Sequence, residues 1–353
     1  MNGAAQIPSG AYETLPSRLY TDGGVFAEEQ DRIFARAWLF AGHRTQVAAP
    51  GDYFTCRAAG ENLIVIHGQD GEIRAFHNLC RHRGHALLIG AGQVRRITCA
   101  YHAWTYDDTG ALRAAPNMEN VKGFDPACHG LRPVRLEVFH GLIFVNLEDG
   151  AQPFAPQTGA ADAEIAEALP SLETRVFAHR TEALLKANWK VAIENFAECY
   201  HCQTVHKTFV QGVVQPESYR VVPRGFCELH DSVSRDGTDR FQGWRVWPLM
   251  ALQSYPGGIA MTFRWIPLSI NETKVEVDWW LPAAEPTPEE AELIRAHAET
   301  TFAEDIPLVE SVQAGLESRG FETGLIMVDE VNSHRSEHGV KVFQDLYRRE
   351  MGL

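Results

Sequence analysis

Basic side chains are scarce in this sequence of 353 residues, and several common signals are missing. Lysine and arginine number 32 against 46 aspartates and glutamates, which leaves a formal charge of −14. An acidic surface repels phosphate backbones and anionic lipids, so we expect neither nucleic acid nor membrane among the partners. No run of about 18 apolar residues occurs. The N-terminal residues lack a basic region followed by an apolar run, so we expect no secretory signal.

Cysteine is also infrequent, with seven residues spread over the chain. An odd number at such spacings is a poor basis for a disulfide framework, so we expect reduced thiols or metal ligands and a cytoplasmic location. The chain also lacks the G-x-G-x-x-G pattern of dinucleotide binding, and no flavin or NAD motif is present. Redox chemistry in this protein would therefore depend on electrons delivered by another protein.

Hydrophobic patterning divides the chain into three parts. Residues 44–150 contain short β-rich runs separated by Gly, Asp and Asn turns, which is typical of an all-β domain of hairpins. The Pro-, Ala- and Gly-rich segment 149–164 marks a boundary, and 151–353 combines helical periodicity with aromatic-rich alternating strands. We therefore predict an α+β protein. A helical segment, 1–43, associates with the third part, and that part is an antiparallel sheet covered by helices.

Helix signals are strongest near the C-terminal end. Thr287 is a plausible N-cap, Pro288 fits the first helical position, and Glu290 completes a capping box. Pro307 interrupts the apolar pattern, so we expect a new helical segment to begin there. Gly320 is the expected end of that segment.

Four potential metal ligands occur in "CRHRGHALLIGAGQVRRITCAYH", spaced C-x-H…C-x-x-H. They are Cys80, His82, Cys99 and His102. Zinc fingers usually pair Cys with Cys and His with His, whereas each loop here offers one of each. That pattern favours a Rieske-type 2Fe–2S cluster, in which the cysteines bind one iron and the histidines the other. Zinc remains the alternative metal at this site. Gly84 and Gly90 suit the tight backbone of such loops. We interpret His77 and His85 as structural or surface residues and not as ligands.

A second set of potential ligands lies at the end of a segment with helical periodicity. The apolar stripe of this segment consists of Trp189, Ile193, Phe196 and Tyr200. Glu198 and His201 are three apart and share a helix face, whereas His206 would lie about 140° from His201 on a regular helix. The two histidines can bind one ion only if the helix distorts or ends between them.

A pair of histidines needs a third ligand. Two histidines and one carboxylate with open positions form the site of non-haem Fe(II) oxygenases. Asp305 in "FAEDIPLVESVQ" is the best candidate, Glu304 is the near alternative, and Glu310 is expected at the surface. Cys199 and Cys202 would favour zinc, but we interpret them as small buried residues that pack the helix. A CxxC redox site is less favoured because no thioredoxin-like context accompanies it.

Together the two constellations resemble the α-subunits of the Rieske non-haem iron oxygenases over almost the whole chain. The likeness rests on C-x-H…C-x-x-H and on N-W-K…E-N-F…E-C-Y-H…H. "NWKVAIENFAECYHC" and "EDIPLVESVQAGLESRG" look most like the branch that oxidises quaternary ammonium compounds such as carnitine and glycine betaine. The resemblance implies an N-terminal Rieske domain followed by a helix-grip catalytic domain. Ala100 departs from the pattern, because the family often has proline there.

The resemblance also implies cofactors and partners. Cys80, His82, Cys99 and His102 would hold the 2Fe–2S cluster, and His201, His206 and Asp305 the mononuclear Fe(II). Glu198 matches the carboxylate that connects a cluster histidine of one subunit with an iron histidine of the next in a homotrimer, where ring-hydroxylating members usually have aspartate. A separate NAD(P)H-dependent flavin and iron–sulfur reductase would supply electrons for the reaction with O₂.

The implied reaction is hydroxylation of a C–H bond next to or near a quaternary nitrogen, as in carnitine or a betaine, followed by C–N cleavage. Aromatic faces attract a permanent cation. The segment expected to form the pocket wall contains Trp244, Trp247, Tyr255, Phe263 and Trp265. Of these, we predict that Trp247 and Trp244 contact the small cationic substrate. Arg245 or Arg264 could bind a substrate carboxylate, but an ion-paired strand arginine is the commoner interpretation of each.

Two alternatives remain, and the second belongs to a different class of function. The first is an aromatic-ring hydroxylase of the same fold, which Glu198 argues against. The second is a Rieske electron carrier or a zinc-stabilised binding module without oxygenase activity. That second alternative leaves residues 151–353 and their separate ligand set unexplained.

Overall fold

The computed structural model describes residues 10–353 and divides them into two units. One unit is Phe34–Phe154, and the other combines the described residues up to Ile33 with Ala155–Leu353. We expected divisions after residues 43 and 150, whereas the structure places them after Ile33 and Phe154. The N-terminal helices therefore group with the C-terminal part of the chain.

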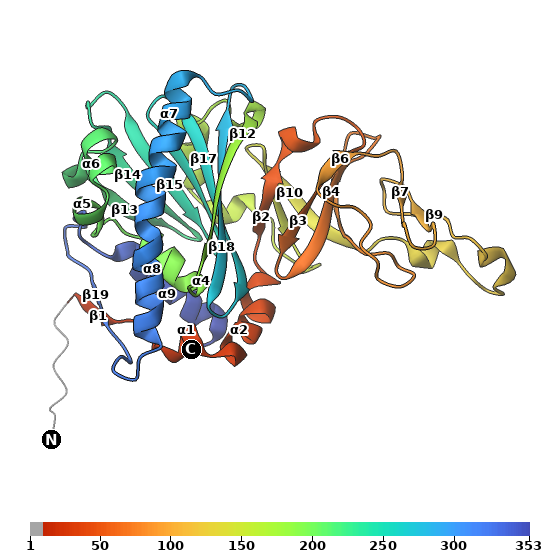
Figure 1. Cartoon of the computed structure of the whole chain (residues 1–353), viewed down its shortest axis with the longest axis horizontal. Helices are drawn as coiled ribbons and strands as arrows, with labels where there is room; N and C mark the ends of the chain where they lie inside the picture. Colours follow the sequence, from red (N-terminus) through yellow and green to blue (C-terminus); the bar gives the residue numbers. More distant parts are fainter. Residues whose placement is uncertain (1–9) are drawn as a thin grey trace. The chain divides into compact units, whose positions relative to one another are not determined.

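The Phe34–Phe154 unit is built on an antiparallel sheet of seven strands (Figure 1). In spatial order these are β2 Leu39–His43, β11 Leu142–Asn146, β10 Pro133–Phe139, β5 Ile73–His77, β4 Glu61–His67, β3 Asp52–Ala58 and β6 Ala91–Gln93. A smaller sheet contains β7 Ile97–Thr98, β8 Thr105–Tyr106 and β9 Leu112–Ala114. The 3-10 turns are η2 Arg44–Val47, η3 Met118–Asn120 and η4 Pro126–His129.

Both sheets of this unit contribute to one hydrophobic cluster. The larger sheet supplies Ile64, Ile66 and Phe76, and the smaller sheet supplies Ile97, Tyr106 and Leu112. Cys80 and Cys99 are members of the same cluster, each with 2% of its surface exposed. The thiols of the predicted cluster site are therefore part of the core that holds the loops in place.

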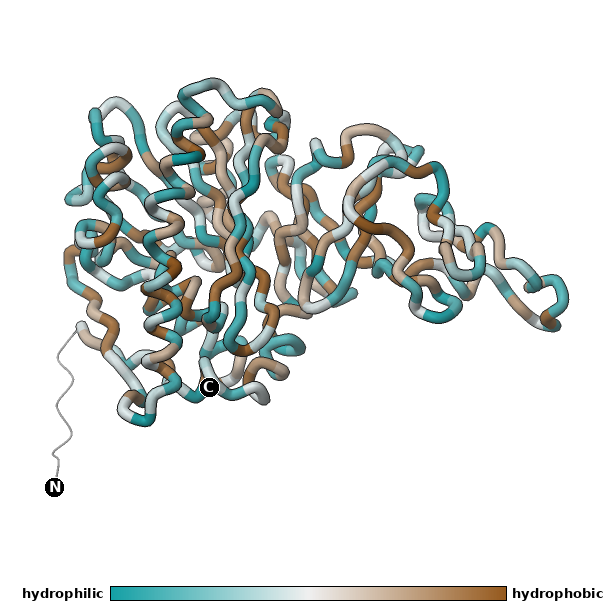
Figure 2. Tube along the Cα trace, viewed as in Figure 1, coloured by the Kyte–Doolittle hydropathy of each residue, from teal (hydrophilic) through white to brown (hydrophobic). Residues whose placement is uncertain are grey.

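The other unit contains a second antiparallel sheet of seven strands. In spatial order they are β12 Val176–Leu185, β18 Glu272–Leu281, β17 Ile259–Ser269, β16 Met250–Tyr255, β15 Arg240–Val246, β14 Cys227–Val233 and β13 Arg220–Arg224. Hydrophobic residues follow the strands of this sheet in Figure 2, and β16 is buried at every position. A two-stranded sheet pairs β1 Ala11–Glu13 with β19 Leu325–Met327.

Helices cover one face of this sheet, and α7 and α8 run across it as one long helical run (Figure 1). The α-helices are α1 Arg18–Thr21, α2 Gly23–Glu29, α3 Ala161–Ala168, α4 Trp189–Phe196, α5 Cys202–Val205, α6 Lys207–Gly212, α7 Pro288–His297, α8 Ala303–Leu316 and α9 His338–Met351. The π turns are η1 Gln30–Phe34 and η8 Ala298–Phe302, and the 3-10 turns are η5 Ala155–Thr158, η6 Leu172–Thr174 and η7 Pro216–Ser218. Within residues 10–353, every helix is too short or too polar to cross a bilayer.

The capping box predicted for the start of α7 is confirmed. The Thr287 side chain accepts the backbone N–H of Glu290, and the Glu290 carboxylate accepts the N–H of Thr287. The expected new start at Pro307 and stop at Gly320 are wrong, because α8 begins at Ala303, passes through Pro307 and ends at Leu316. Pro307 is the fifth residue of α8, so the bond that it cannot donate would end on Ala303, the first residue of the helix, and only that one backbone bond is lost.

A buried carboxylate connects the N-terminal helices to the rest of this unit. Glu29 accepts hydrogen bonds from Trp189 Nε1 at 2.8 Å, from Lys190 Nζ at 2.5 Å and from the Tyr347 hydroxyl at 2.7 Å. Burial lowers the pKa of Lys190, although the Glu29 charge opposes that effect. Because one carboxylate joins α2, α4 and α9, the segment before Ile33 packs with the C-terminal half of the chain.

Two candidate metal centres

Two loops of the Phe34–Phe154 unit have the same backbone geometry. The N–H of Gly84 donates to the Cys80 oxygen, and the N–H of Ala103 donates to the Cys99 oxygen, both at 2.9 Å. Gly84 and Ala103 also share a positive φ, at 73° and 57°. Each loop therefore holds its cysteine at the start of a five-residue turn, with the histidine two residues later in the first loop and three residues later in the second. Gly84 was predicted to serve such a turn, whereas nothing in the sequence marked Ala103.

The four residues predicted to bind the cluster differ in how far they are buried. Cys80 and Cys99 are buried, whereas His82 and His102 are exposed with ring centroids 4.7 Å apart. The Tyr106 hydroxyl lies 3.4 Å from Cys80 Sγ and accepts the Arg81 N–H at 3.0 Å. Two enclosed sulfurs and two adjacent surface imidazoles are the donor set that a Rieske cluster requires. These residues could hold such a cluster, and they could also hold zinc on donor type alone.

In the other unit, the helix that precedes the second ligand set ends before it. Helix α4 stops at Phe196, and α5 is a single turn from Cys202 to Val205 with His201 before it and His206 after it. We predicted that the helix would distort or end between the two histidines. Helix α4 ends before both of them, and the turn α5 ends between them, so the predicted break is confirmed. Tyr200 was expected on the buried stripe of α4, but it lies beyond the helix and is 50% exposed.

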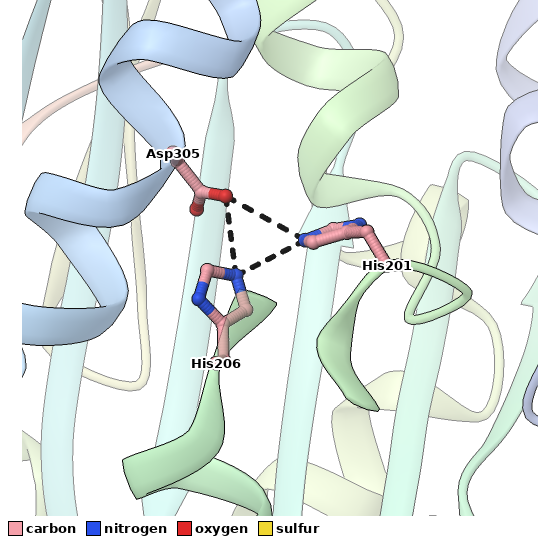
Figure 3. A group of neighbouring side chains, drawn as sticks. All are labelled: His201, His206 and Asp305. Atoms are coloured by element: carbon pink, nitrogen blue, oxygen red, sulfur yellow. Dashed lines mark hydrogen bonds and ion pairs between the residues drawn. The ribbon is translucent and has the colours of Figure 1, made fainter. Parts of the chain in front are cut away.

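His201, His206 and Asp305 converge on one point (Figure 3). His201 Nε2 and His206 Nε2 are 3.1 Å apart, and Asp305 Oδ1 lies 3.5 Å from the first and 3.1 Å from the second. Asp305 Oδ1 is buried without a hydrogen-bond partner among the described residues. Two imidazole nitrogens and one carboxylate oxygen that face one another at these distances form a set that suits a divalent metal ion.

Two further carboxylates orient the histidines from the opposite side. Glu198 Oε1 contacts His201 Nδ1 at 2.5 Å, and Glu304 Oε2 contacts His206 Nδ1 at 2.9 Å. Each Nδ1–H donates to a carboxylate, which leaves Nε2 unprotonated and free to bind a metal. Glu304 was the alternative to Asp305 as third ligand. It contacts the outer nitrogen of His206 and is not one of the three residues that converge. Glu310 accepts the backbone N–H of Lys186 outside this group.

These carboxylates also affect the protonation of the histidines. Burial lowers the pKa of His201, but its hydrogen bond with Glu198 and the charges of Glu198 and Asp305 outweigh burial and raise it overall. Burial also lowers the pKa of His206, but the hydrogen bonds and charges of Asp305 and Glu304 outweigh burial and raise this pKa overall. Both imidazoles therefore attract a cation at Nε2, either a proton or a metal ion, so metal binding would release protons.

The interpretation of Cys199 and Cys202 as unpaired thiols is wrong. Both side chains are buried, as expected, but the structure joins them in a disulfide. The turn after α4 places their Cα atoms 4.9 Å apart, within the range that a disulfide spans. The disulfide joins residues on either side of His201 in the sequence. Cys202 also lines a cavity next to the three converging residues.

An aromatic-rich cavity of about 90 Å³ adjoins the three converging residues. One bound water needs only about 10–15 Å³ on the same measure, so this volume suits a small molecule. The aromatic lining residues are Phe196, Phe209, Tyr219, Phe241, Tyr255, Phe263, Trp265 and Phe302. Tyr255, Phe263 and Trp265 were named from the sequence as part of the pocket wall. The others, together with Gln253 and His297, were missed.

Trp244 and Trp247 are not among the described residues that line the cavity, so the prediction that they contact substrate is corrected. Trp244 is three positions from the cavity residue Phe241 on β15, and an odd separation places it on the opposite face of the strand. Its Nε1 donates to Glu164 at 3.2 Å. Trp247 follows the strand and packs against Phe343 of α9, with centroids 5.5 Å apart.

The two strand arginines are ion-paired within the sheet. Arg245 Nε donates to Glu228 at 2.8 Å, and both side chains are completely buried. Arg264 Nε donates to Glu276 at 3.1 Å. Neither arginine lines the described cavity, which agrees with the ion-paired interpretation.

The chain belongs to the Rieske non-haem iron oxygenases. Residues 37–125 match the Rieske [2Fe-2S] domain, and residues 172–234 and 215–353 match the ring hydroxylating alpha subunit (catalytic domain). The protein is therefore an oxidoreductase that uses O₂, and its cofactors are a 2Fe–2S cluster and a mononuclear iron. The match also decides between the cluster and zinc in the first unit.

Within this family the chain is similar to enzymes that act on quaternary ammonium compounds. It is 36% identical to the carnitine monooxygenase oxygenase subunit of Escherichia coli K12, over 94% of this chain and 92% of that protein. It is 29% identical to the glycine betaine monooxygenase oxygenase subunit of Chromohalobacter salexigens, over 96% and 86%. The structure of the quaternary ammonium Rieske monooxygenase CntA with L-carnitine superposes with a TM-score of 0.91 at 34% identity, over 97% of this chain and 96% of that one. Naphthalene 1,2-dioxygenase, at 22% identity and a TM-score of 0.81, shares the fold.

Proposed function

We propose that this chain is the oxygenase component of a monooxygenase that hydroxylates a carbon next to or near the quaternary nitrogen of a small cation such as carnitine or a betaine. The observation that carries the proposal is the aromatic cavity beside His201, His206 and Asp305. Eight aromatic side chains line it, and aromatic faces hold a cation that cannot be neutralised by proton loss. The similarity to the carnitine and glycine betaine enzymes supports the same substrate class.

Each residue set has a proposed role in this reaction. We assign the cluster to Cys80, His82, Cys99 and His102, and the mononuclear iron to His201, His206 and Asp305. When bound, the iron supplies the site at which O₂ is reduced. The chain contributes the geometry around it, because Glu198 and Glu304 fix the ring orientations and aromatic side chains line the cavity beside them.

The balance of the reaction determines what the protein must receive. Hydroxylation consumes one O₂, two electrons and two protons for each C–H bond, and it produces one alcohol and one water. When the hydroxyl is on the carbon bonded to nitrogen, the product collapses by C–N cleavage to an aldehyde and a smaller amine. One Rieske cluster carries one electron at a time, so a separate NAD(P)H-dependent flavin and iron–sulfur reductase must reload it.

Glu198 is the proposed link between the two metal sites of neighbouring subunits in a homotrimer. One of its oxygens contacts His201 Nδ1, and the other accepts the Tyr200 N–H. The adjacent Tyr200 is 50% exposed, so this turn lies at the surface of the chain. A solved quaternary ammonium Rieske monooxygenase is described in terms of inter-subunit electron transfer, which supports the same arrangement here. A cytoplasmic location remains a prediction.

A substrate panel with product identification tests the proposal. The purified protein, with a Rieske-oxygenase reductase and NADH, is offered carnitine, γ-butyrobetaine, glycine betaine, choline and naphthalene. We expect O₂ uptake matched by amine release from at least one quaternary ammonium compound, and about three irons per chain without stoichiometric zinc. Hydroxylated naphthalene without amine release from any cation would favour the ring hydroxylase instead.

A further inference from the structure

One buried nitrogen atom on the cavity wall has no hydrogen-bond partner within the described residues. His297 is the last residue of α7, lines the cavity and has 5% of its surface exposed. Its Nδ1 atom is buried and has no hydrogen-bond partner among residues 10–353. Because buried polar groups nearly always have a partner in native structures, an imidazole in this position calls for a specific explanation.

The surroundings of His297 are aromatic on several sides. Its ring centroid lies 5.5 Å from Trp279, 5.9 Å from Phe263, 6.3 Å from Tyr255 and 6.3 Å from Phe302. Hydrocarbon of similar volume would pack here without the cost of an unsatisfied nitrogen. The cavity that His297 lines is where a partner for this imidazole can be supplied, by a water or by an oxygen atom of a bound molecule.

The imidazole is also suited to bind a neutral or anionic oxygen. Burial lowers the pKa of His297 to about 4, even though the Asp305 charge acts to raise it. A neutral imidazole has one N–H donor and one acceptor nitrogen, so it can donate to a carboxylate or exchange hydrogen bonds with a hydroxyl. An uncharged ring also avoids the repulsion that a second cation would cause beside a quaternary ammonium group.

The position along the helical run relates His297 to the metal site. It precedes Asp305 by eight residues, a little more than two turns of a regular α-helix. The π turn η8 lies between them, and π turns are frequent at functional sites. Both residues line the same cavity. A molecule held by His297 at one end can therefore present a different atom to the metal-binding end.

We propose that His297 is a substrate-positioning residue that binds an oxygen substituent of the quaternary ammonium substrate, a hydroxyl or a carboxylate, and so selects the carbon that faces the metal site. This inference rests on the proposed function and adds to it a determinant of specificity within the cavity. The aromatic rings bind the cationic group, and His297 binds the oxygen that distinguishes one quaternary ammonium compound from another.

Three substrates separate the contributions of the two oxygen substituents. L-Carnitine differs from γ-butyrobetaine by one hydroxyl, and γ-butyrobetaine differs from butyltrimethylammonium by its carboxylate. The variants are His297→Leu, which removes both nitrogens, and His297→Gln, which retains a polar group of similar reach. Phe302→Leu is the matched control, because it changes an apolar cavity residue on the same helical run. Iron content and cluster absorption are recorded for each variant, and kcat/KM, product identity and O₂ uptake for each pair of variant and substrate.

We expect wild type to prefer the oxygenated member of at least one pair. His297→Leu should lower kcat/KM for that member by about tenfold or more and leave its counterpart within about twofold. His297→Gln should recover part of the loss, and Phe302→Leu should affect both members of the pair alike. An unchanged preference in His297→Leu, or an equal loss for both members with intact iron, would overturn the positioning role. Absence of turnover of every cation by wild type would instead overturn the proposed function, and the positioning role with it.

Discussion

A Cβ atom placed on Gly339 would lie 1.9 Å from the backbone oxygen of Ala197. The first turn of α9 therefore packs against the end of α4 only because position 339 is glycine. Ala197 immediately precedes Glu198, so this contact sets the backbone from which the turn with Glu198 and His201 begins. A residue far from the metal site in sequence thus positions one of its histidines.

Gly339→Ala should displace that turn. The new methyl group would meet backbone and not a flexible side chain, so we expect a loss of about 1–3 kcal/mol in the free energy of unfolding. Mononuclear iron content should fall, while the absorption of the 2Fe–2S cluster in the other unit stays unchanged. Gly315→Ala is the control, since a Cβ there meets nothing within 4 Å in an exposed part of α8. Equal behaviour of the two variants would show that the contact does not position the site.

Asp305→Ala should remove the mononuclear iron selectively. The two Nε2 atoms would lose the one carboxylate oxygen that faces both of them, and two neutral imidazoles hold Fe(II) poorly without it. We expect iron analysis to fall from about three to about two irons per chain, with the cluster spectrum intact and activity lost. Loss of the cluster spectrum in this variant would contradict the assignment of Asp305 as a ligand of the mononuclear iron.

Glu304→Gln should weaken the iron site without abolishing it. The carboxylate that accepts from His206 Nδ1 becomes a neutral amide, which holds the ring less firmly and makes Nε2 less basic. Outer carboxylates of this kind typically contribute about 10–100-fold in metal affinity or activity, so we expect a loss in that range when Fe(II) is titrated into the apo protein. Glu310→Gln, six residues along the same helix, is the control and should bind iron as wild type does.

Local sequence patterns predicted much of this structure. The C-x-H…C-x-x-H spacing identified four residues that the structure places on two similar turns, because each turn holds a cysteine and a histidine that are close in sequence. The spacing of His201 and His206 required the helix to distort or end between them, and the single turn α5 ends at Val205, directly before His206. The capping box at Thr287 formed as predicted because all its bonds are within four residues.

Predictions that depended on tertiary packing were less successful. Trp244 and Phe241 are both aromatic residues of one strand, and the sequence does not state which face of the sheet the helices cover. The roles of Glu304 and Asp305 are separated only by the direction in which α8 presents adjacent side chains. His297 carried no signal, because its environment is formed by β16, β17, β18 and η8 together.

Arg245→Met should destabilise the catalytic unit in a pH-dependent way. Burial raises the pKa of Glu228 above its ordinary value, although the charge and hydrogen bonds of Arg245 oppose the shift. Without Arg245 the folded-state pKa of Glu228 rises further, so the folded protein retains a proton that the unfolded chain releases above about pH 4. The free energy of unfolding should therefore decrease as pH rises above that value, with a loss of about 3–5 kcal/mol near pH 8.

Urea unfolding at pH 6 and pH 8 measures this effect. The double variant Arg245→Met with Glu228→Leu removes both buried charges and is the matched control. It should recover most of the lost stability and show no added dependence on pH. If Arg245→Met loses the same free energy of unfolding relative to wild type at pH 6 and at pH 8, the raised pKa of Glu228 is contradicted.

Glu198→Gln tests the proposed connection between the metal sites. Glutamine can still accept the Tyr200 N–H, so the turn should keep its shape. The amide behind His201 should weaken iron binding as Glu304→Gln does, so the variant is loaded with excess Fe(II) until its iron content equals that of wild type. The amide cannot accept a proton or carry charge between two imidazoles, and we expect electron transfer from cluster to iron to slow by about tenfold or more. Single-turnover oxidation of pre-reduced protein, followed by the return of the cluster absorption after O₂ and substrate are added, isolates this step from the reductase. If that rate equals the wild-type rate while iron content is full, Glu198 is not on the route, and its contact with His201 Nδ1 serves only to orient the ring.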